Sequence, residues 1–424
     1  MKFYIYTLGC KVNTYESEMM REKLIAHGYF EQEENPDIVI VNTCSVTNVA
    51  DQKSRKMVRH FKSLFPSSVL VVCGCSSLNK TSDYEEMEPD ILLGNTRKSD
   101  IVDLIEQYMK TNQRYENVEK SRDLTFEDMN VKKFSTHTRA YMKIQDGCDN
   151  FCSYCVIPFV RGKRRNKNFD ECYLEAEELV KNGHQEIVLT GIHTGSYEDQ
   201  GHDLTDVIHE ISKLDGLKRI RISSIEVTEL TDKFLNELKN NPKICPHLHI
   251  PLQAGSDKIL SLMNRKYDLN DFEEKLKQIR LILPDISIST DIIVGFPCET
   301  EEDMQETLLN AKKFAFSKVH VFPYSKREGT KASRMENQVI ASEKKRRSKE
   351  LVRLSNQLER EYALKFDGKV MSVLIENNDR FCVGSTSNYL KVFVEGSYPP
   401  NTLLDVKLHV LEDGRILGKV MLGN

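Results

Sequence analysis

The sequence lacks any apolar run long enough to cross a membrane, and it lacks a marked excess of either charge. No stretch approaches the roughly 18 uninterrupted apolar residues of a transmembrane helix. The apolar start Met1–Cys10 is short and is followed at once by Lys11, so we expect no secretory signal peptide. The formal net charge of −4 argues against non-specific nucleic-acid binding by the chain as a whole, although it leaves room for local basic patches. We therefore expect a cytoplasmic protein without a membrane partner.

Cysteine, by contrast, is abundant. Eleven cysteines stand in a chain of 424 residues, which is long enough for two or three domains. Structural disulfides are rare in a reducing compartment, so metal or redox ligation is the more typical use of so many thiols. The 39% hydrophobic and 29% charged residues are ordinary for a soluble globular protein.

The most informative cysteines form the run Gly147-Cys-Asp-Asn-Phe-Cys-Ser-Tyr-Cys155, directly after an apolar strand-like stretch. Cys148, Cys152 and Cys155 can bind three irons of a cubane 4Fe–4S cluster and leave the fourth iron open, which favours chemistry over electron transfer. A zinc knuckle or a set of free thiols is the alternative. A zinc site normally needs a fourth paired ligand, and this loop lacks one.

Residues 1–112 are expected to form a parallel α/β sheet. A helix is predicted from about Tyr15 to Gly28, and another over residues 50–64, where apolar side chains recur at helical spacing. Repeated βα units with continuous apolar strands indicate a parallel sheet with helices on its faces. The strands are predicted at Phe3–Leu8, Asp37–Val41, Val69–Val72 and Ile91–Leu93.

Three further cysteines follow strands of this sheet at corresponding positions. Cys10, Cys44 and Cys75 each lie just beyond the carboxyl end of a predicted strand. Such ends share one edge of a parallel sheet, where ligands bind, so these residues could meet at one point. Any one of them alone would be a packing residue, but three in register predict a second iron–sulfur site. Cys73 still belongs to its strand and is expected to be a buried small hydrophobe.

Residues 113–133 are polar and charged, which predicts a linker, and residues 134–364 then repeat strand and helix six times. Six βα units are too few for a closed eight-stranded barrel, so we expect a partial (β/α)6 barrel whose wide mouth admits a large substrate. Its strands are predicted at Tyr141–Gln145, Glu186–Thr190, Arg219–Ser224, His247–Pro251, Ile286–Val294 and Val319–Tyr324.

Polar residues at the carboxyl ends of the barrel strands are candidates for the site lining. The set is Thr190, Gly191, Glu226, Gln253 and Asp291. Their charged and amide groups could hold a polar cofactor, and Gly191 could let the backbone approach it closely. For each of them, a strand-end hydrogen bond without chemical consequence is the alternative.

Residues 365–424 are expected to form a small antiparallel β-barrel of the kind used in RNA binding. Five short strands are predicted at Lys369–Glu376, Phe381–Val383, Leu390–Val394, Leu403–His409 and Ile416–Val420, with one turn at residues 377–379. The alternative role is a stabilising cap. Seven Lys/Arg and seven Asp/Glu give this segment no electrostatic preference for RNA.

Basic residues gather at two other places. One run comprises Arg161, Lys163, Arg164, Arg165 and Lys167, and the other Lys344, Lys345, Arg346, Arg347 and Lys349. Phosphate attraction would lay nucleic acid across the barrel mouth. A solvated surface is the alternative, and the first run is the better candidate because it adjoins the reactive loop.

Several motifs, in this order, carry a family resemblance over essentially the whole chain. They are Thr7-Leu-Gly-Cys-Lys-Val-Asn13, Asn42-Thr-Cys-Ser-Val-Thr47, Val72-Cys-Gly-Cys75, the run Gly147–Pro158, Arg161-Gly162, Leu189-Thr-Gly-Ile-His-Thr-Gly195, His247-Leu-His-Ile-Pro-Leu-Gln253, Asp291-Ile-Ile-Val-Gly-Phe-Pro297 and His320-Val-Phe-Pro-Tyr324. Together they resemble the methylthiotransferase family of radical S-adenosylmethionine (SAM) enzymes. The last 60 residues resemble a TRAM domain, which in relatives contacts the substrate.

The resemblance implies cofactors and roles. Cys148, Cys152 and Cys155 would hold the radical cluster, and its open iron would bind SAM and cleave it to a 5′-deoxyadenosyl radical. A second 4Fe–4S cluster on Cys10, Cys44 and Cys75 would carry or donate sulfur. Tyr154 and the polar strand-end residues would contact SAM. An electron donor of the flavodoxin or ferredoxin type and a sulfur donor are the implied partners. The product is a methylthio group at an unactivated C–H bond.

The residues after Cys10 point to one substrate branch. Lys11-Val12-Asn13 looks like the bacterial branch that modifies N6-threonylcarbamoyladenosine next to the anticodon of tRNA, and Lys11 could pair with the threonyl carboxylate. Arg161, Arg164 and Arg165 are the other candidates for substrate contact. The alternatives are a methylthiotransferase that acts on isopentenyladenosine in tRNA or on a ribosomal protein, and, in another class, a non-catalytic zinc-loaded RNA-binding protein.

Overall fold

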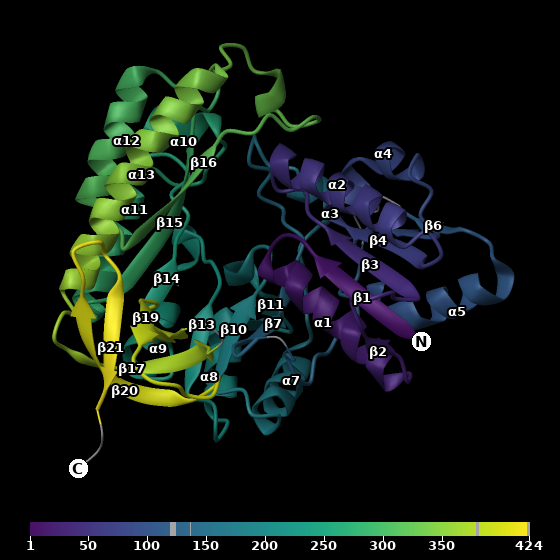
Figure 1. The fold of residues 1–424 in the computed structure, drawn as a ribbon. Helices are drawn as coiled ribbons and strands as arrows, with labels where there is room; N and C mark the ends of the chain where they lie inside the picture. The colour runs from purple at the N-terminus through teal and green to yellow at the C-terminus, as the bar shows by residue number, and fades with distance from the viewer. Residues whose placement is uncertain (119–123, 136, 379–380, 422–424) are drawn as a thin grey trace.

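A computed structural model describes residues 1–118, 124–135, 137–378 and 381–421. Figure 1 shows an N-terminal α/β part, a central barrel wall with helices outside it, and a yellow C-terminal barrel. In the described residues no helix is long and apolar enough to span a bilayer.

The N-terminal part is one parallel sheet of six strands in the order β2-β1-β3-β4-β5-β6. Its strands are β1 (Lys2–Thr7), β2 (Phe30–Glu31), β3 (Ile38–Thr43), β4 (Val69–Gly74), β5 (Ile91–Leu93) and β6 (Tyr115–Asn117). Its helices are α1 (Lys11–Ala26), α2 (Asn48–Leu64), α3 (Cys75–Asn79), α4 (Thr81–Glu85) and α5 (Ile101–Thr111). The predicted parallel sheet is confirmed. The edge strands β2 and β6 were not foreseen, because they have only two and three residues.

Successive side chains of these strands point to opposite faces, and each face has its own helices. Ile38 and Ile40 of β3 belong to a core that includes α1 and α5, whereas Val39 and Val41 pack with Val58 of α2 in a separate cluster. Both faces are therefore buried, as a continuous apolar strand predicts. The carboxyl ends of β1, β3 and β4 are left free to carry the loops of Cys10, Cys44 and Cys75.

The central part contains six parallel strands in two sheets, β13-β10-β7 and β14-β15-β16. The sheets meet where Ile220 pairs in parallel with Ile244 and where the Ile225 amide donates to the His249 carbonyl at 3.0 Å. The strands are β7 (Ala140–Lys143), β10 (Glu186–Thr190), β13 (Arg219–Ile222), β14 (His247–His249), β15 (Ser287–Val294) and β16 (Lys318–Pro323). This arrangement confirms the predicted partial (β/α)6 barrel.

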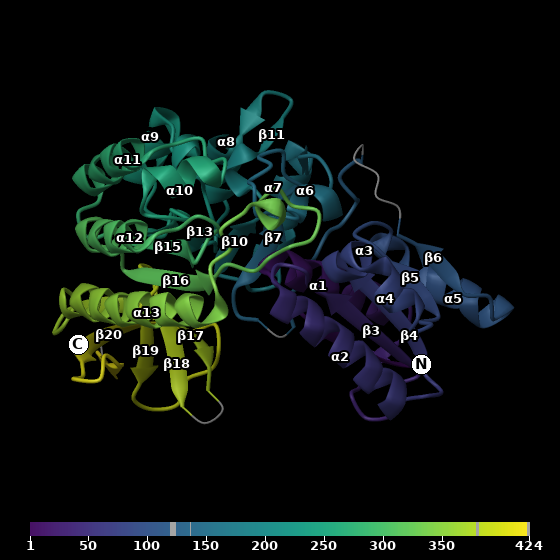
Figure 2. The ribbon, with the colours of Figure 1, turned by 90° about the horizontal axis from the view of Figure 1, so that it is seen from above.

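The helices that follow these strands lie outside the barrel wall (Figure 2). They are α7 (Phe169–Lys181), α8 (Leu204–Ser212), α9 (Asp232–Asn240), α10 (Asp257–Leu262), α11 (Leu269–Ile282), α12 (Glu301–Lys313) and α13 (Ala341–Leu364). Between the first strand, β7, and its helix α7 lies a loop with the short helix α6 (Ile157–Val160). The same loop contains the small ladder of β8 (Gln145–Asp146) with β9 (Arg165–Asn166). A second small ladder pairs β11 (Glu198–Asp199) with β12 (His202–Asp203).

The C-terminal part is a closed barrel in the order β17-β18-β19-β21-β20. Its strands are β17 (Val370–Asn377), β18 (Cys382–Thr386), β19 (Lys391–Val394), β20 (Leu403–Val410) and β21 (Ile416–Val420). Five strands were predicted and five are found, but the barrel is not wholly antiparallel. Its β19 and β21 pair in parallel, because β20 lies between them in sequence and closes the barrel against β17. Asp379 of the predicted turn is outside the described residues.

Residues 113–133, which we predicted to be a linker, take part in packing. Tyr115–Asn117 form β6, and Met129 and Val131 are 1% and 0% exposed in the main core. Residues 119–123 of this segment are outside the described residues. Its apolar side chains are too widely spaced for a periodic signal, so burial against two domains was not visible in the sequence.

Residues 113–133 also connect the N-terminal part to the central part, through the hydroxyl of a tyrosine on α1. The Tyr15 hydroxyl lies 2.7 Å from the Met129 carbonyl oxygen and 2.8 Å from Glu175 Oε1 on α7, and Tyr15 is fully buried. We expect Tyr15→Phe to cost about 1 kcal/mol, because it removes a buried hydrogen-bond donor while Lys167 and the Val131 amide still donate to the same two acceptors.

Thermal unfolding should show this loss as a Tm lowered by a few degrees. Tyr6→Phe is the control, because Tyr6 packs on Phe61 at 5.3 Å and its hydroxyl has no hydrogen-bond partner in the described part of the chain. Equal Tm values for Tyr15→Phe and the parent protein would contradict a role for this contact in joining the two parts.

Candidate functional site

The loops of Cys10, Cys44 and Cys75 meet at the carboxyl edge of the N-terminal sheet. A Cβ placed on Gly9, next to Cys10, would lie 3.1 Å from Cys44 Sγ. Burial raises the pKa of Cys44 to about 12, and the neighbouring thiols of Cys75 and Cys10 add to this rise. Cys44 and Cys75 are 6% and 5% exposed, whereas Cys10 is open to solvent. Three thiols thus gather at one edge, with one of them accessible.

Local backbone geometry makes this gathering possible. Gly74 has a φ of +108°, and a Cβ there would lie 2.4 Å from the carbonyl oxygen of Thr43, so only glycine fits between β4 and Cys75. Cys73, one position earlier, is fully buried in the core on the helix α1 side of the sheet, as we predicted.

Cys148, Cys152 and Cys155 lie in the loop between β8 and α6, and all three are partly exposed. The Cys155 amide donates to the Cys152 carbonyl at 3.0 Å, which closes a tight turn. Burial raises the pKa of Cys155 to about 12, and the nearby thiols of Cys152 and Cys148 contribute. The loop therefore holds a second group of three neighbouring thiols.

The two groups of thiols are in adjacent structures. Cys75 and Leu78 of α3 pack against Val160 of α6, the helix that directly follows Cys155. The Asn95 side-chain amide donates to the Val160 carbonyl at 2.8 Å and to Cys75 Sγ at 3.5 Å. A cofactor on one group would thus face the space beside the other.

Polar side chains surround the loop of Cys148–Cys155 in a small cavity. It is lined by Asn150, Cys152, His193, Glu226, Thr228, Asn264, Arg265, Lys266 and Tyr267. Arg265 Nη1 donates to Cys152 Sγ at 3.2 Å, and its Nη2 pairs with Glu226. A cation beside this loop suits a cofactor with a carboxylate, and Glu226 could accept from ribose hydroxyls.

Of the six residues predicted to contact SAM, Glu226 lines this cavity, and Tyr154 lies in the loop itself. Gly191 is beside the loop, since a Cβ there would lie 3.0 Å from the Gln145 side chain. Thr190 is 1% exposed and its hydroxyl bonds back to the Val188 carbonyl. Thr190 therefore makes the strand-end hydrogen bond that we gave as the alternative to SAM contact.

Gln253 and Asp291 lie farther along the barrel wall. The Gln253 amide donates to the Asp291 carbonyl at 2.8 Å, and Gln253 has a left-handed φ of +69°. The Asp291 carboxylate lies 3.3 Å from His249 Nε2. These two residues are coupled to each other, and the structure does not bring them into the cavity at Cys152.

His193, Glu229 and Arg265 were missed as site residues. His193 Nδ1 is 4.0 Å from Cys148 Sγ, and its Nε2 is 2.6 Å from Glu229 Oε1. Burial opposes protonation, but the hydrogen bonds to Cys148 and Glu229 raise the pKa of His193 to about 10. His193 stands in the motif Leu189–Gly195, so a signal was present. Arg265 follows a helix rather than a barrel strand and gave none.

The first basic run does not form the surface patch we expected. Arg161 is fully buried, Arg165 is 8% exposed and Lys167 is 1% exposed. Their partners are carboxylates: Arg165 pairs with Asp146 at 2.9 Å and Lys167 with Glu175. Lys163 and Arg164 remain at the surface, where Arg164 Nη1 donates to the Ser196 carbonyl. The sequence could not show that buried carboxylates from other elements take up these cations.

The second basic run is divided in the same way. Arg347 is buried against Glu299 at 2.7 Å, and Arg346 pairs with Glu343 and Glu350 on the exposed side of α13. Lys345 and Lys349 are exposed.

Lys11 is half-buried at the start of α1, next to Cys10. Burial lowers the pKa of Lys11, the phenol of Tyr389 opposes this shift, and Arg139 and Arg221 reinforce it. Residues of all three parts of the chain therefore act on one ammonium group. Tyr389 is held there because its hydroxyl accepts from Arg139 Nη1 at 3.0 Å and Arg221 lies 4.4 Å from its ring centre.

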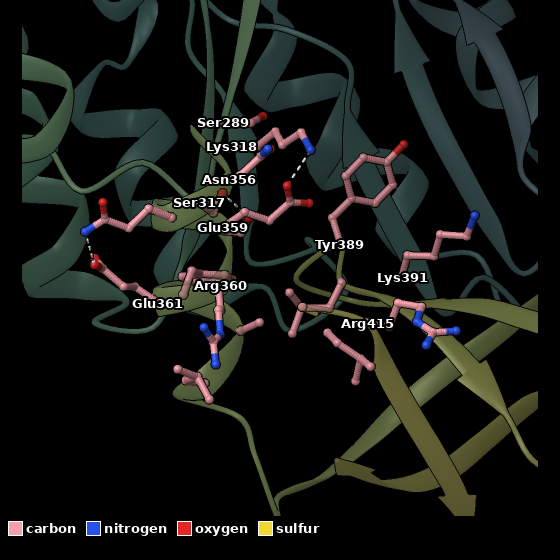
Figure 3. A pocket seen from close by; sticks show the side chains of 18 of the residues that line it. Ser289, Ser317, Lys318, Asn356, Glu359, Arg360, Glu361, Tyr389, Lys391 and Arg415 are labelled. Carbon is pink, nitrogen blue, oxygen red and sulfur yellow. Dashed lines mark hydrogen bonds and ion pairs between the residues drawn. The ribbon is translucent and has the colours of Figure 1, made fainter. Parts of the chain in front are cut away.

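A cavity of about 940 Å³ lies elsewhere, between α13, the first residues of β14–β16 and the C-terminal barrel (Figure 3). Its cations Lys318, Arg360, Lys391 and Arg415 are matched by the carboxylates Glu359, Glu361, Glu412 and Asp413. It contains no cysteine of either group. The cysteine loops follow the opposite, carboxyl ends of their strands, so we assign the chemistry to them and not to this cavity.

No three His, Cys, Asp or Glu side chains of the described residues are close enough together to hold a single metal ion. The assignment of cluster ligands consequently depends on the placement of the thiols and on the groups around them. Arg161 and Asn95 donate to Cys75, and Arg265 donates to Cys152, and these donors suit anionic sulfur. Each group of thiols therefore has a neighbouring donor of the kind that stabilises anionic sulfur.

Comparison with known families gives two matches in the expected order. Residues 2–94 match the model described as "Uncharacterized protein family UPF0004", and residues 142–311 match the radical SAM superfamily. The six candidate cysteines are divided between these segments, with three in each.

Close relatives extend over nearly the whole chain. The threonylcarbamoyladenosine tRNA methylthiotransferase MtaB of Bacillus subtilis is 40% identical and covers 92% of this chain and 90% of its own length. The protein of the same name from Thermotoga maritima is 40% identical over 88% of this chain and 86% of its own. A tRNA-2-methylthio-N(6)-dimethylallyladenosine synthase from Endomicrobium trichonymphae is 36% identical and covers 93% and 94%.

Among solved structures, the radical S-adenosylmethionine methyltransferase TsrM from Kitasatospora setae superposes with a TM-score of 0.56 at 12% identity, covering 76% of this chain and 72% of its own. This likeness concerns the fold alone.

We expect the two groups of thiols to hold iron independently. Anaerobic reconstitution should give about eight irons and eight sulfides per chain, and about four of each when either Cys10, Cys44 and Cys75 or Cys148, Cys152 and Cys155 are replaced by alanine. Replacement of Cys73, Cys172 and Cys245 is the control and should leave the iron content unchanged. A colourless protein that binds zinc would contradict this assignment.

Proposed function

Because the chain belongs to the methylthiotransferase family of radical SAM enzymes, we propose that it inserts a methylthio group at C2 of N6-threonylcarbamoyladenosine next to the anticodon of tRNA. Enzymes of this family are transferases that use SAM and two 4Fe–4S clusters. The observation that carries the proposal is the contact between the loops of the two groups of thiols through α3 and α6. A tRNA-modifying role agrees with a cytoplasmic location.

The chemistry demands two centres. No protein base can deprotonate an unactivated C–H bond, because the pKa of that bond is far outside the range of protein groups. When bound at the radical cluster, one SAM would supply the radical that abstracts hydrogen, a second SAM would supply the methyl group, and the second cluster would supply sulfur. An electron donor and a sulfur donor are needed as partners, and we propose a flavodoxin- or ferredoxin-like protein as the former.

We assign the radical cluster to Cys148, Cys152 and Cys155 and the auxiliary cluster to Cys10, Cys44 and Cys75. The chain's own residues orient SAM: Arg265 offers a guanidinium to a carboxylate, and Glu226 offers an acceptor next to it. His193, held by Glu229, lines the same cavity and places its Nδ1 4.0 Å from Cys148 Sγ. Tyr154, within the loop, and Gly191, next to Gln145, are further candidates for SAM contact.

Lys11 supports the choice of substrate. Its ammonium group is next to Cys10, the most exposed thiol of the auxiliary group, and Arg139 and Arg221 are close enough to act on it. A group of cations beside the sulfur-bearing site suits a base that carries a carboxylate. Threonylcarbamoyladenosine has one and isopentenyladenosine has none. Arg164, on the surface after the Cys148–Cys155 loop, is our candidate for phosphate contact.

Replacement of one cysteine from each group should separate two activities. We expect Cys152→Ala to abolish SAM cleavage, because the radical cluster loses a ligand. Cys44→Ala should retain SAM cleavage and lose methylthio transfer, since only the sulfur source is damaged. Chromatographic quantification of 5′-deoxyadenosine and mass spectrometry of tRNA nucleosides measure the two activities. Equal loss of both in each variant would contradict separate roles for the two clusters.

Lys11→Gln tests the substrate. A lost charge-assisted hydrogen bond of about 1.5–3 kcal/mol predicts a roughly 10- to 100-fold lower kcat/KM on tRNA that contains threonylcarbamoyladenosine. Lys11→Arg should recover part of this loss, and the exposed Lys53→Gln on the same domain is the matched control.

The parent enzyme should be assayed in parallel on tRNA with isopentenyladenosine and on ribosomal protein. Modification of either of these, with threonylcarbamoyladenosine left untouched, would place the enzyme in another branch of the family. The iron content of Lys11→Gln should equal that of the parent, which separates substrate recognition from cluster assembly.

A further inference from the structure

We propose that Arg161 is a positioning residue for the auxiliary cluster. Arg161 holds Cys75 in place and supplies a positive charge that the thiolates of the cluster balance. This proposal depends on the proposed function, because it requires a cluster on Cys10, Cys44 and Cys75. A buried arginine of the radical domain would thus act on the cofactor of the neighbouring domain.

The contacts of Arg161 use every part of its guanidinium. Nε donates to Cys75 Sγ at 3.2 Å, Nη2 donates to Asn13 Oδ1 at 2.8 Å, and Nη1 lies 2.9 Å from Glu16 Oε1 and 3.1 Å from Asp146 Oδ1. The side chain is fully buried. A planar group held at three edges has one orientation, so the direction of its Nε toward the sulfur is fixed.

Arg161 also has a particular place in the chain. It follows α6, and its amide donates to the Ile157 carbonyl at 2.8 Å, so it is tied to the loop of Cys148–Cys155. Its partners Asn13, Glu16 and Cys75 belong to the N-terminal sheet domain. One side chain therefore connects the radical-cluster loop to a ligand of the other cluster.

The charges around Arg161 are not balanced by carboxylates. Four buried cations, Arg161, Lys98, Lys143 and Arg165, share two buried carboxylates, Glu16 and Asp146. Glu127 is a partly exposed third carboxylate that hydrogen-bonds to Ser99 and also acts on Lys143 and Lys98, so an excess of one positive charge remains. Buried positive charge without a counter-charge is costly, so the excess requires anions.

Thiolate sulfur is the anion that the structure offers. Cys75 accepts from Arg161 directly, and Cys10 is close enough to act on the same guanidinium. An iron–sulfur cluster bound by three thiolates gains another negative charge on reduction. A fixed cation beside it favours the reduced form and raises the reduction potential.

Arg219 provides a matched comparison. It is 5% exposed, reaches Glu186 at 3.5 Å, and donates to the carbonyls of Ser385 and Ser372 in the C-terminal barrel. Like Arg161 it is a buried arginine that joins two domains through a carboxylate and polar groups. It contacts no cysteine, so it has the structural role without the electrostatic one.

The test uses the full chain in which Cys148, Cys152 and Cys155 are alanine, so that the auxiliary cluster is the one measured. In this background we compare iron content, EPR spectrum and potentiometric titration between the parent with intact Arg161 and the variants Arg161→Lys, Arg161→Gln and Arg219→Gln. We expect Arg161→Gln to lower the ratio of reduced to oxidised cluster about tenfold at the parent's midpoint, which corresponds to about 59 mV. Arg161→Lys keeps the charge and should give a smaller change with an altered EPR spectrum.

The outcomes are distinct. Loss of the cluster in Arg161→Gln, with retention in Arg161→Lys and Arg219→Gln, also supports the proposal, because it shows that Cys75 needs the guanidinium. Titrations of Arg161→Gln that match those of the parent or of Arg219→Gln overturn it. If the parent with intact Arg161 binds no cluster in this background, the two-cluster function itself fails. If the parent binds a cluster and the Arg161 variants have the same reduction potential as the parent, only the role of Arg161 is rejected.

Discussion

The structure depends on one buried ionic network where the N-terminal sheet meets the barrel. Glu16 on α1 is 2.9 Å from both Arg161 and Lys143, and Asp146 binds Arg161, Lys143 and Arg165 from the barrel side. Although burial opposes ionisation, these cations hold the pKa of both carboxylates below the usual range. Removing one member would leave buried charges unpaired, so the network fixes how the two domains sit.

The orientation of the two domains determines the site. Each group of thiols lies at the carboxyl ends of parallel strands, but in separate sheets, so neither fold by itself brings one group to the other. The ionic network and the packing of α3 on α6 set their relation, and Tyr15 on the far side of α1 adds a third contact. In the proposed function, delivery of sulfur from one centre to a substrate activated at the other needs a fixed geometry, which a flexible link between domains would not give.

Elements with a strong local pattern were predictable from the sequence. The strands around Ile40 and Ile187 are continuous apolar runs, and the cysteines follow the strands in register, so the sheet, the partial barrel and both groups of thiols were foreseen. Side-chain partners at long sequence separation were not. Arg161 meets Glu16 across 145 positions, and no local pattern distinguishes it from the surface Arg164 three residues later. The parallel β19–β21 pair and the packing role of Met129 were missed for the same reason.

The C-terminal barrel is packed against the central part and takes part in this arrangement. Arg219 and Arg221 of β13 donate to the carbonyls of Ser385, Thr386 and Ser387, and this anchors the turn that presents Tyr389. Tyr389 lies beside Arg139, and its phenol is close enough to Lys11 to act on it. A segment with balanced charge can thus still shape the surroundings of Lys11, because it positions an aromatic ring next to the cations instead of attracting phosphate itself. The surroundings of Lys11 therefore depend on all three domains together.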